Sequence, residues 1–205
     1  MFLKSIMMGC AALAMGLSGA AMAQKGEFDG SSFTCLQFTN GQGANSSGKA
    51  QAGLAKIWMT GYLAGYYKAR GSLEIVDDAA ADGKLVGSIL SKCREYPQTS
   101  ILTVSMQALG ADARKLPAMV TADFNPQSYT CGNHVDAKGG SAADAMNADI
   151  AELWAFAFIQ GYKNVAQPDM VIPLENKPVL TGAIANNCAK NRETPYFDLT
   201  ALVAE

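Results

Sequence analysis

Apolar residues recur at helical spacing in two stretches of the chain. In each stretch they occupy positions i, i+3, i+4, i+7, i+8, i+11 and i+12. The first set is Leu54, Ile57, Trp58, Gly61, Tyr62, Gly65 and Tyr66, and the second is Ile150, Leu153, Trp154, Ala157, Phe158, Gly161 and Tyr162. This spacing predicts one amphipathic helix in each stretch.

Two glycines lie on the predicted buried face of the first helix. Each glycine weakens a helix by about 1 kcal/mol relative to alanine. Small side chains at Gly61 and Gly65 predict that another backbone approaches closely, with the large aromatic residues filling the space around the crossing. The alternative is an aromatic groove that binds a ligand or a partner. The candidate binding residues are Trp58, Tyr62, Tyr66, Trp154, Phe158 and Tyr162.

The chain repeats itself at a separation of about 96 residues. Phe33–Cys35 recurs as Tyr129–Cys131, and the same shift places Trp58 on Trp154. Self-similarity at a fixed period predicts a tandem duplication. The predicted units are residues 32–110 and 128–205, with a connector at 111–127 that contains two prolines.

The first 23 residues resemble a bacterial signal peptide. Lys4 precedes an apolar, alanine-rich run, and Ala21–Ala23 forms a small-x-small cleavage signal, so we expect cleavage after Ala23 and export to the periplasm. Removal of this segment takes Cys10 with it.

Four cysteines then remain in the exported chain, and an even number predicts disulfides. Four cysteines allow three pairings. The repeat favours one bridge within each unit, Cys35 with Cys93 and Cys131 with Cys188.

Further helices are predicted on either side of the second cysteine of each unit. In the first unit one helix begins after Asp82, and its counterpart in the second unit begins near Asn176. The following helix begins at Thr99 or Ser100 in the first unit. Its counterpart in the second unit begins at Thr194, which precedes a proline. Strand patterns are weak throughout. The predicted fold class is therefore all-α, with two small disulfide-stapled helical units in tandem as a pseudo-dimer.

The charge balance excludes several classes of partner. The chain has 16 basic and 18 acidic residues, a net charge of −2, which is too mild for nucleic acid or an anionic membrane surface. Beyond the signal peptide no long apolar run exists, so no stable membrane association is expected. These features leave the oligomeric state open.

Catalytic chemistry is poorly represented in the sequence. The one histidine, His134, is expected in a glycine-rich surface loop near Asp136. A Cys–His nucleophile pair would need a free thiol, whereas Cys131 is assigned to a disulfide. Asp77-Asp78 is expected to be a solvated turn. The sequence lacks the close Cys-x-x-Cys pair that is typical of zinc sites. We therefore predict no catalytic residues, no metal and no cofactor.

Three motifs together resemble a known family. They are the aromatic-Thr pair before Cys35, the pattern Trp58-x-x-Gly61-Tyr62-x-x-Gly65, and a cysteine followed shortly by proline, Cys93 to Pro97. This combination resembles the HdeA/HdeB family of small periplasmic acid-stress chaperones, and the resemblance touches both units. It implies compact helical units with one disulfide each, and a holdase activity that binds unfolding client proteins when the periplasm becomes acid.

Two features depart from that family. Its members are typically single units that pair as homodimers, whereas both units here share a chain. The second unit has Arg192 where the first has Pro97. The alternative function is a non-enzymatic periplasmic binding or interaction module, with an unknown periplasmic protein as partner and no acid-dependent role.

Overall fold

The structure is a computed structural model, and it describes residues 28–30, 32–43, 46–76, 79–109, 115–117, 120, 124–168, 170 and 172–205. The predicted signal peptide at 1–23 and the Asp77-Asp78 pair lie outside these residues. The described part is mostly helical, which confirms the all-α fold class.

The helices are α1 (Cys35–Gly43), α2 (Ser46–Ala69), α3 (Ala79–Glu95), α4 (Ile101–Leu109), α5 (Cys131–Gly139), α6 (Ala142–Ala166), α7 (Lys177–Cys188) and α8 (Tyr196–Ala204). A short 3-10 helix, η2 (Leu174–Asn176), leads into α7, and two short strands are β1 (Glu74–Val76) and β2 (Lys115–Pro117). We call α1–α4 the first half and α5–α8 the second half. No described helix has both the length and the apolar character needed to cross a membrane.

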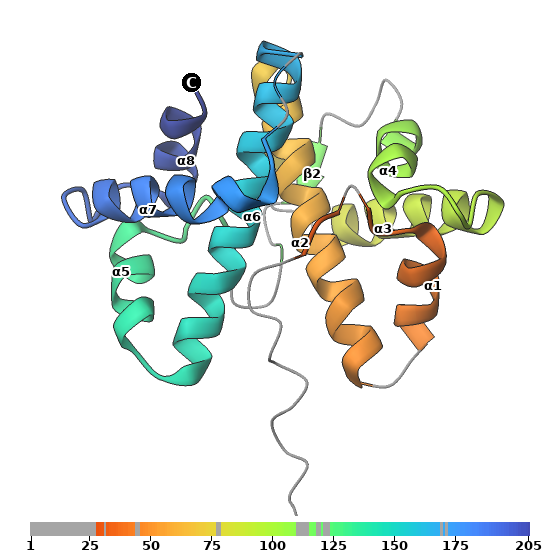
Figure 1. Cartoon of the computed structure of the whole chain (residues 1–205), viewed down its shortest axis with the longest axis horizontal. Helices are drawn as coiled ribbons and strands as arrows, with labels where there is room; N and C mark the ends of the chain where they lie inside the picture. Colours follow the sequence, from red (N-terminus) through yellow and green to blue (C-terminus); the bar gives the residue numbers. More distant parts are fainter. Residues whose placement is uncertain are drawn as a thin grey trace, which may run out of the picture.

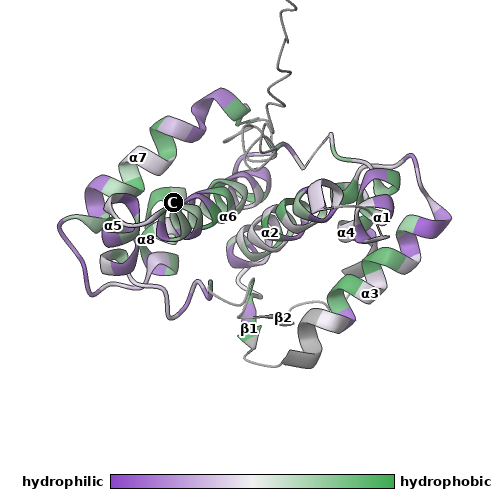
Figure 2. Cartoon of the chain, turned by 90° about the horizontal axis from the view of Figure 1, so that it is seen from below, coloured by the Kyte–Doolittle hydropathy of each residue, from purple (hydrophilic) through white to green (hydrophobic). Residues whose placement is uncertain are grey.

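The two long helices α2 and α6 pack against each other at the centre of the molecule (Figure 1). Helices α1, α3 and α4 lie on one side of this pair, and α5, α7 and α8 lie on the other. Figure 2, viewed from below, shows the same central pair side by side between the two groups of shorter helices.

Glycines set the distance between α2 and α6. A Cβ built at Gly65 would overlap the carbonyl oxygen of Phe158, and one at Gly161 would overlap the carbonyl oxygen of Tyr62. At a shift of 96 residues Gly65 corresponds to Gly161 and Tyr62 corresponds to Phe158, so each contact is the equivalent of the other. This reciprocity is the property of an isologous contact. Gly61 likewise lies against the backbone of Trp154. The close backbone approach predicted at Gly61 and Gly65 is therefore confirmed.

Both predicted disulfides are present. Cys35–Cys93 joins α1 to α3, and Cys131–Cys188 joins α5 to α7. Sequence separations of 58 and 57 residues correspond in the chain-entropy model to a stabilisation of about 4 kcal/mol for each bridge.

Equivalent backbone hydrogen bonds occur within each half. The N–H of Cys35 donates to the carbonyl oxygen of Thr99 at 2.9 Å, and the N–H of Cys131 donates to that of Thr194, also at 2.9 Å. The isolated antiparallel bridges beside them, Thr34 with Ser100 and Thr130 with Pro195, recur in the same way. Each half thus closes its first short helix onto the segment before its last helix.

Several helix boundaries follow the sequence and others do not. Ser141 caps α6, since its hydroxyl accepts from the N–H of Asp144 and the Asp144 carboxylate accepts from the N–H of Ser141. Helix α3, however, begins at Ala79, so the prediction of a cap at Asp82 was wrong. The cap of α8 is Pro195, one residue after the predicted Thr194.

Part of the predicted connector at 111–127 packs onto the protein. Strand β2 pairs with β1 in parallel, with Ile75 opposite Leu116. Phe124 is fully buried, and its ring lies 5.2 Å from Tyr129 and 6.1 Å from Trp154. This segment therefore contributes to the core beside α6, which the sequence pattern did not indicate.

Candidate functional site

The six aromatic candidates lie on α2 and α6, around their crossing. Trp58 and Trp154 are each 1% exposed, and Phe158 is fully buried. Tyr62 is also buried, while Tyr66 and Tyr162 are half-buried. Four of the six side chains are therefore closed into the protein and do not line an open groove.

Trp58 is held from both long helices. Its indole N–H donates to the side-chain oxygen of Gln160 on α6 at 3.1 Å, and the Gln160 amide donates to the carbonyl oxygen of Ile172 at 3.1 Å. The indole stacks on Tyr62 with centroids 5.2 Å apart. Gly30 covers its face so closely that a Cβ there would overlap the ring. Trp58 is therefore fixed within the central packing.

Trp154 instead belongs to an aromatic cluster inside the second half. Its ring centroid lies 5.4 Å from Phe158 and 6.2 Å from Phe197 of α8, in addition to its contact with Phe124. Phe158 and Phe197 meet edge to face at 5.6 Å. One continuous aromatic surface thus runs from the central crossing into the second half.

The expectation of a surface-loop histidine at position 134 was wrong. His134 lies on α5 and is 0% exposed. Its ring is 4.8 Å from that of Tyr196 and 6.3 Å from that of Tyr129. Sequence reasoning missed this site because α5 is short and rich in glycine, and no helix was predicted there.

Polar atoms around His134 are left without hydrogen bonds. Neither ring nitrogen has a partner, and the buried hydroxyls of Tyr129 and Tyr196 also have none. Glu152 of α6 places Oε1 3.7 Å from Nε2, which is too long for a hydrogen bond. Lys138 Nζ lies only 2.5 Å from that same oxygen. We call His134, Tyr129, Tyr196 and Glu152 the histidine cluster.

Burial shifts the titration of the cluster. It lowers the pKa of His134 to about 4; the positive charge of Lys138 acts in the same direction and Asp149 opposes it. Burial raises the pKa of Tyr129 to about 12 and raises the pKa of Tyr196 well above its usual range. The imidazole and both phenols are therefore uncharged at neutral pH, because each would lose hydration on charging.

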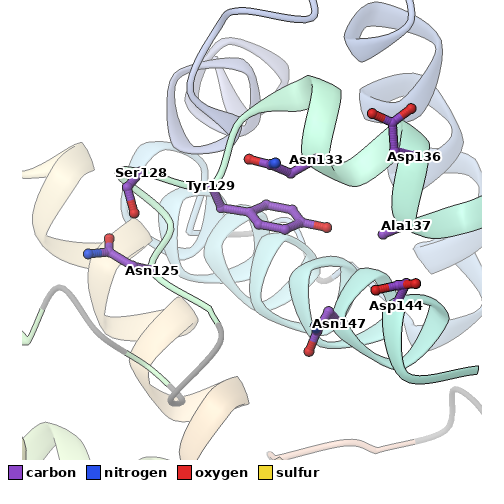
Figure 3. Close-up of a pocket in the computed structure, with 8 residues that line it drawn as sticks. All are labelled: Asn125, Ser128, Tyr129, Asn133, Asp136, Ala137, Asp144 and Asn147. Carbon is purple, nitrogen blue, oxygen red and sulfur yellow. The ribbon is translucent and has the colours of Figure 1, made fainter. Parts of the chain in front are cut away.

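A polar hollow of about 520 Å³ lies beside the cluster, between α5 and α6 (Figure 3). Its lining residues are Asn125, Ser128, Tyr129, Asn133, Asp136, Ala137, Asp144 and Asn147. Both carboxylates are already engaged. Asp136 accepts two hydrogen bonds from Arg192 at 2.7 and 2.8 Å, and Asp144 accepts from the N–H and the hydroxyl of Ser141. The hollow therefore offers mainly amides and hydroxyls.

The first half has glycines at two places equivalent to residues that line the hollow. A Cβ at Gly41 would lie 2.7 Å from the carbonyl oxygen of Gly48, so α1 and α2 touch there. Ala137 and Asp144 occupy those places in the second half, 96 residues later. Ala137 and Asp144 both line the hollow, so larger side chains stand there at the places that glycines occupy in the first half.

Within the described residues, no three His, Cys, Asp or Glu side chains are grouped to hold a metal ion. Comparison of the chain with protein-family models, with curated proteins and with solved structures found no match. Any proposal of a function therefore rests on the geometry of the aromatic residues, the histidine cluster and the polar hollow.

Proposed function

We propose that this protein is a periplasmic acid-stress holdase that binds unfolding proteins at low pH through aromatic residues of α2 and α6. The observation that carries the proposal is the closure of Trp58 and Trp154 inside the neutral protein. A binding module active at neutral pH would present such residues in an open groove. A holdase instead keeps its apolar surface covered until stress exposes it.

We also infer that the two halves are units of a tandem duplication, related as a covalent pseudo-dimer. The equivalent disulfides, the recurring hydrogen bonds and the exchangeable contacts at Gly65 and Gly161 support this inference. The central α2–α6 crossing then takes the place of a homodimer interface, as the resemblance to the HdeA/HdeB family implies.

Acid supplies a driving force for exposure. Carboxylates have ordinary pKa values near 4, so most of the 18 Asp and Glu residues lose their charge at about pH 3. Of the 16 Lys and Arg residues, all but Lys4 of the predicted signal peptide remain in the exported chain and keep their charge, and the resulting repulsion favours expansion. During such expansion the two disulfides keep α1 joined to α3 and α5 joined to α7.

The polar hollow favours a second candidate function, a non-enzymatic periplasmic module that binds a small polar ligand or another periplasmic protein. It is the weaker candidate because the carboxylates that line the hollow already accept hydrogen bonds from within the protein. Asp136 accepts from Arg192 and Asp144 accepts from Ser141.

Light scattering of an aggregating client protein tests the proposal. The oxidised, exported chain should suppress aggregation at about pH 3, where the carboxylates are protonated, and should not do so at pH 7. Tyr162→Ser, at the edge of the aromatic surface, should weaken suppression. Val179→Ser, which removes a 73% exposed side chain on α7, is the matched control and should leave it unchanged. Failure to suppress aggregation in acid, or equal suppression at both pH values, would exclude the holdase function.

A further inference from the structure

Three of the four residues of the histidine cluster have apolar counterparts in the first half. The equivalent residues, 96 positions earlier for the first three and 95 for the last, are Phe33 for Tyr129, Phe38 for His134, Lys56 for Glu152 and Ile101 for Tyr196. Their backbones are held alike: the N–H of Phe38 donates to Thr34, and the N–H of His134 donates to Thr130. Phe38 and Ile101 are fully buried, as are His134 and Tyr196. The same site therefore has an apolar core in one half and an ionisable core in the other.

His134 is also distinctive within the described residues as a whole. The buried polar side chains there are Thr60, Ser105, His134, Thr181 and Thr200. Only His134 among them can gain a proton between neutral and acid pH. The α2–α6 crossing buries glycines, aromatic rings and Thr60, so acid does not place a charge inside it.

Charged groups face His134 from the elements that surround it. Glu152 and Asp149 of α6 favour a positive imidazole, while Lys138 of α5 opposes it. Lys177 of α7 belongs to the same group of charges, since Glu152, Asp149 and Lys138 all influence its pKa. Tyr129 and Tyr196 contribute neutral rings. The nearest anion, Glu152, is already paired with Lys138 at 2.5 Å and lies 3.7 Å from Nε2. A protonated His134 would therefore share this carboxylate with Lys138 and would gain no hydrogen bond in the closed core.

We propose that mild acid opens the second half before the first, because protonation of His134 drives α5 and α8 away from α6 while the α2–α6 crossing stays closed. The opened form exposes Trp154, Phe158 and Phe197, the continuous aromatic surface described above. Exposure of this surface as the client-binding surface rests on the proposed holdase function. The opening itself does not.

The pH range of the opening follows from linkage. The unfolded pKa of histidine is near 6.5, and the closed state holds that of His134 at about 4. A lowered folded-state value means that the open state binds protons more readily, so stability is lost as pH falls from 6.5 towards 4. From pH 7 to about pH 5 the opening equilibrium constant of the second half rises about 20-fold. Carboxylates remain mostly ionised in that range.

Two measurements on the full oxidised chain test the switch without any client. The chain has a single histidine, so one imidazole NMR signal reports its titration, and the folded protein should titrate near pH 4. Amide hydrogen exchange, expressed as protection factors, should show an about 20-fold loss in α5 and α8 between pH 7 and about pH 5. Helices α1 and α4 should keep their protection.

The first half supplies the matched variants. His134→Phe installs the residue that occupies the equivalent core, and it should abolish the pH-dependent loss in α5 and α8. Phe38→His should transfer that loss to α1 and α4. Any of three results would overturn the switch. The first is titration of His134 near its ordinary pKa in the folded wild-type chain. The others are a simultaneous loss of protection in both halves and an unchanged loss of protection in His134→Phe. The NMR titration decides the question even where a variant fails to fold.

Client assays separate this inference from the proposed function. If the second half opens but no client is held at any acid pH, the holdase proposal fails and the switch stands. If wild type and His134→Phe begin to hold a client at the same pH, the switch fails and the holdase proposal stands. The two proposals taken together expect wild type to begin at a higher pH than His134→Phe.

Discussion

Replacing Gly65 by alanine tests whether the two long helices cross at backbone contact. The added Cβ would overlap the carbonyl oxygen of Phe158 and lie 2.7 Å from its carbonyl carbon and 2.8 Å from the nitrogen of Tyr162. Ordinary van der Waals contacts of a Cβ begin near 3.4 Å. Because all three neighbours are backbone atoms, none can rotate away, and α6 has to move from α2.

Two opposing terms set the size of the effect. Overpacking typically costs 1–3 kcal/mol, and rigid backbone neighbours place Gly65→Ala near the upper end, about 3 kcal/mol. Alanine recovers about 1 kcal/mol through its better helix propensity. We therefore expect a net loss of about 2 kcal/mol. Gly161→Ala should lose a similar amount, because its contact with Tyr62 is the same contact exchanged between the halves.

Urea unfolding of the oxidised protein measures these changes, with Gly53→Ala as the control. Gly53 lies on the same helix, is exposed, and a Cβ added there would have no atom within 4 Å. Alanine there should stabilise the protein by about 1 kcal/mol. The two variants should thus differ by about 3 kcal/mol, or about 1.5 M in midpoint for a slope of about 2 kcal/mol/M. If Gly65→Ala is as stable as Gly53→Ala, the close crossing is wrong.

Three further predictions follow from the pKa of His134, the disulfides and the surface ion pair. The free energy of unfolding should fall by about 3 kcal/mol between pH 7 and pH 4 on account of His134; urea titrations at several pH values should show this component missing in His134→Phe. Replacing both cysteines of either disulfide by alanine should cost about 4 kcal/mol at pH 7, measured by the same titration, and a loss below about 1 kcal/mol would contradict the chain-entropy argument. Asp136→Asn breaks an exposed ion pair and should change stability by less than about 1 kcal/mol, so a larger thermal shift would show that the pair supports the hollow.

The long helices and the disulfides were predictable from sequence because each leaves a pattern over many residues. Two stripes of apolar positions identified α2 and α6, and the repeat selected the cysteine pairing. The small size of Gly61 and Gly65, set among large aromatic residues, was enough to indicate the close crossing. In each case the signal was carried by several residues that agree with one another.

The short elements were missed for physical reasons. Helices α1 and α5 have nine residues each and contain glycines, so their own propensity is low and they depend on a disulfide and on packing. Strands β1 and β2 have three residues each, too few for an alternating pattern. The burial of His134 was missed together with α5, although alignment of the two halves places it on Phe38 and would have indicated a core position.

The difference between the cores of the two halves also bears on where an acid response can arise. A covalent link keeps the partner half at an effective concentration of order mM, which opposes separation of α2 from α6. The crossing itself contains no group that acid would charge, and its glycines allow close packing along both helices. The interior of the second half, by contrast, holds an imidazole with no hydrogen bond. We therefore expect an acid response in the core of the second half before one at the α2–α6 crossing. Because Cys131–Cys188 still joins α5 to α7 after that core loosens, these two helices stay together in the opened half. The half can then close again when the pH rises.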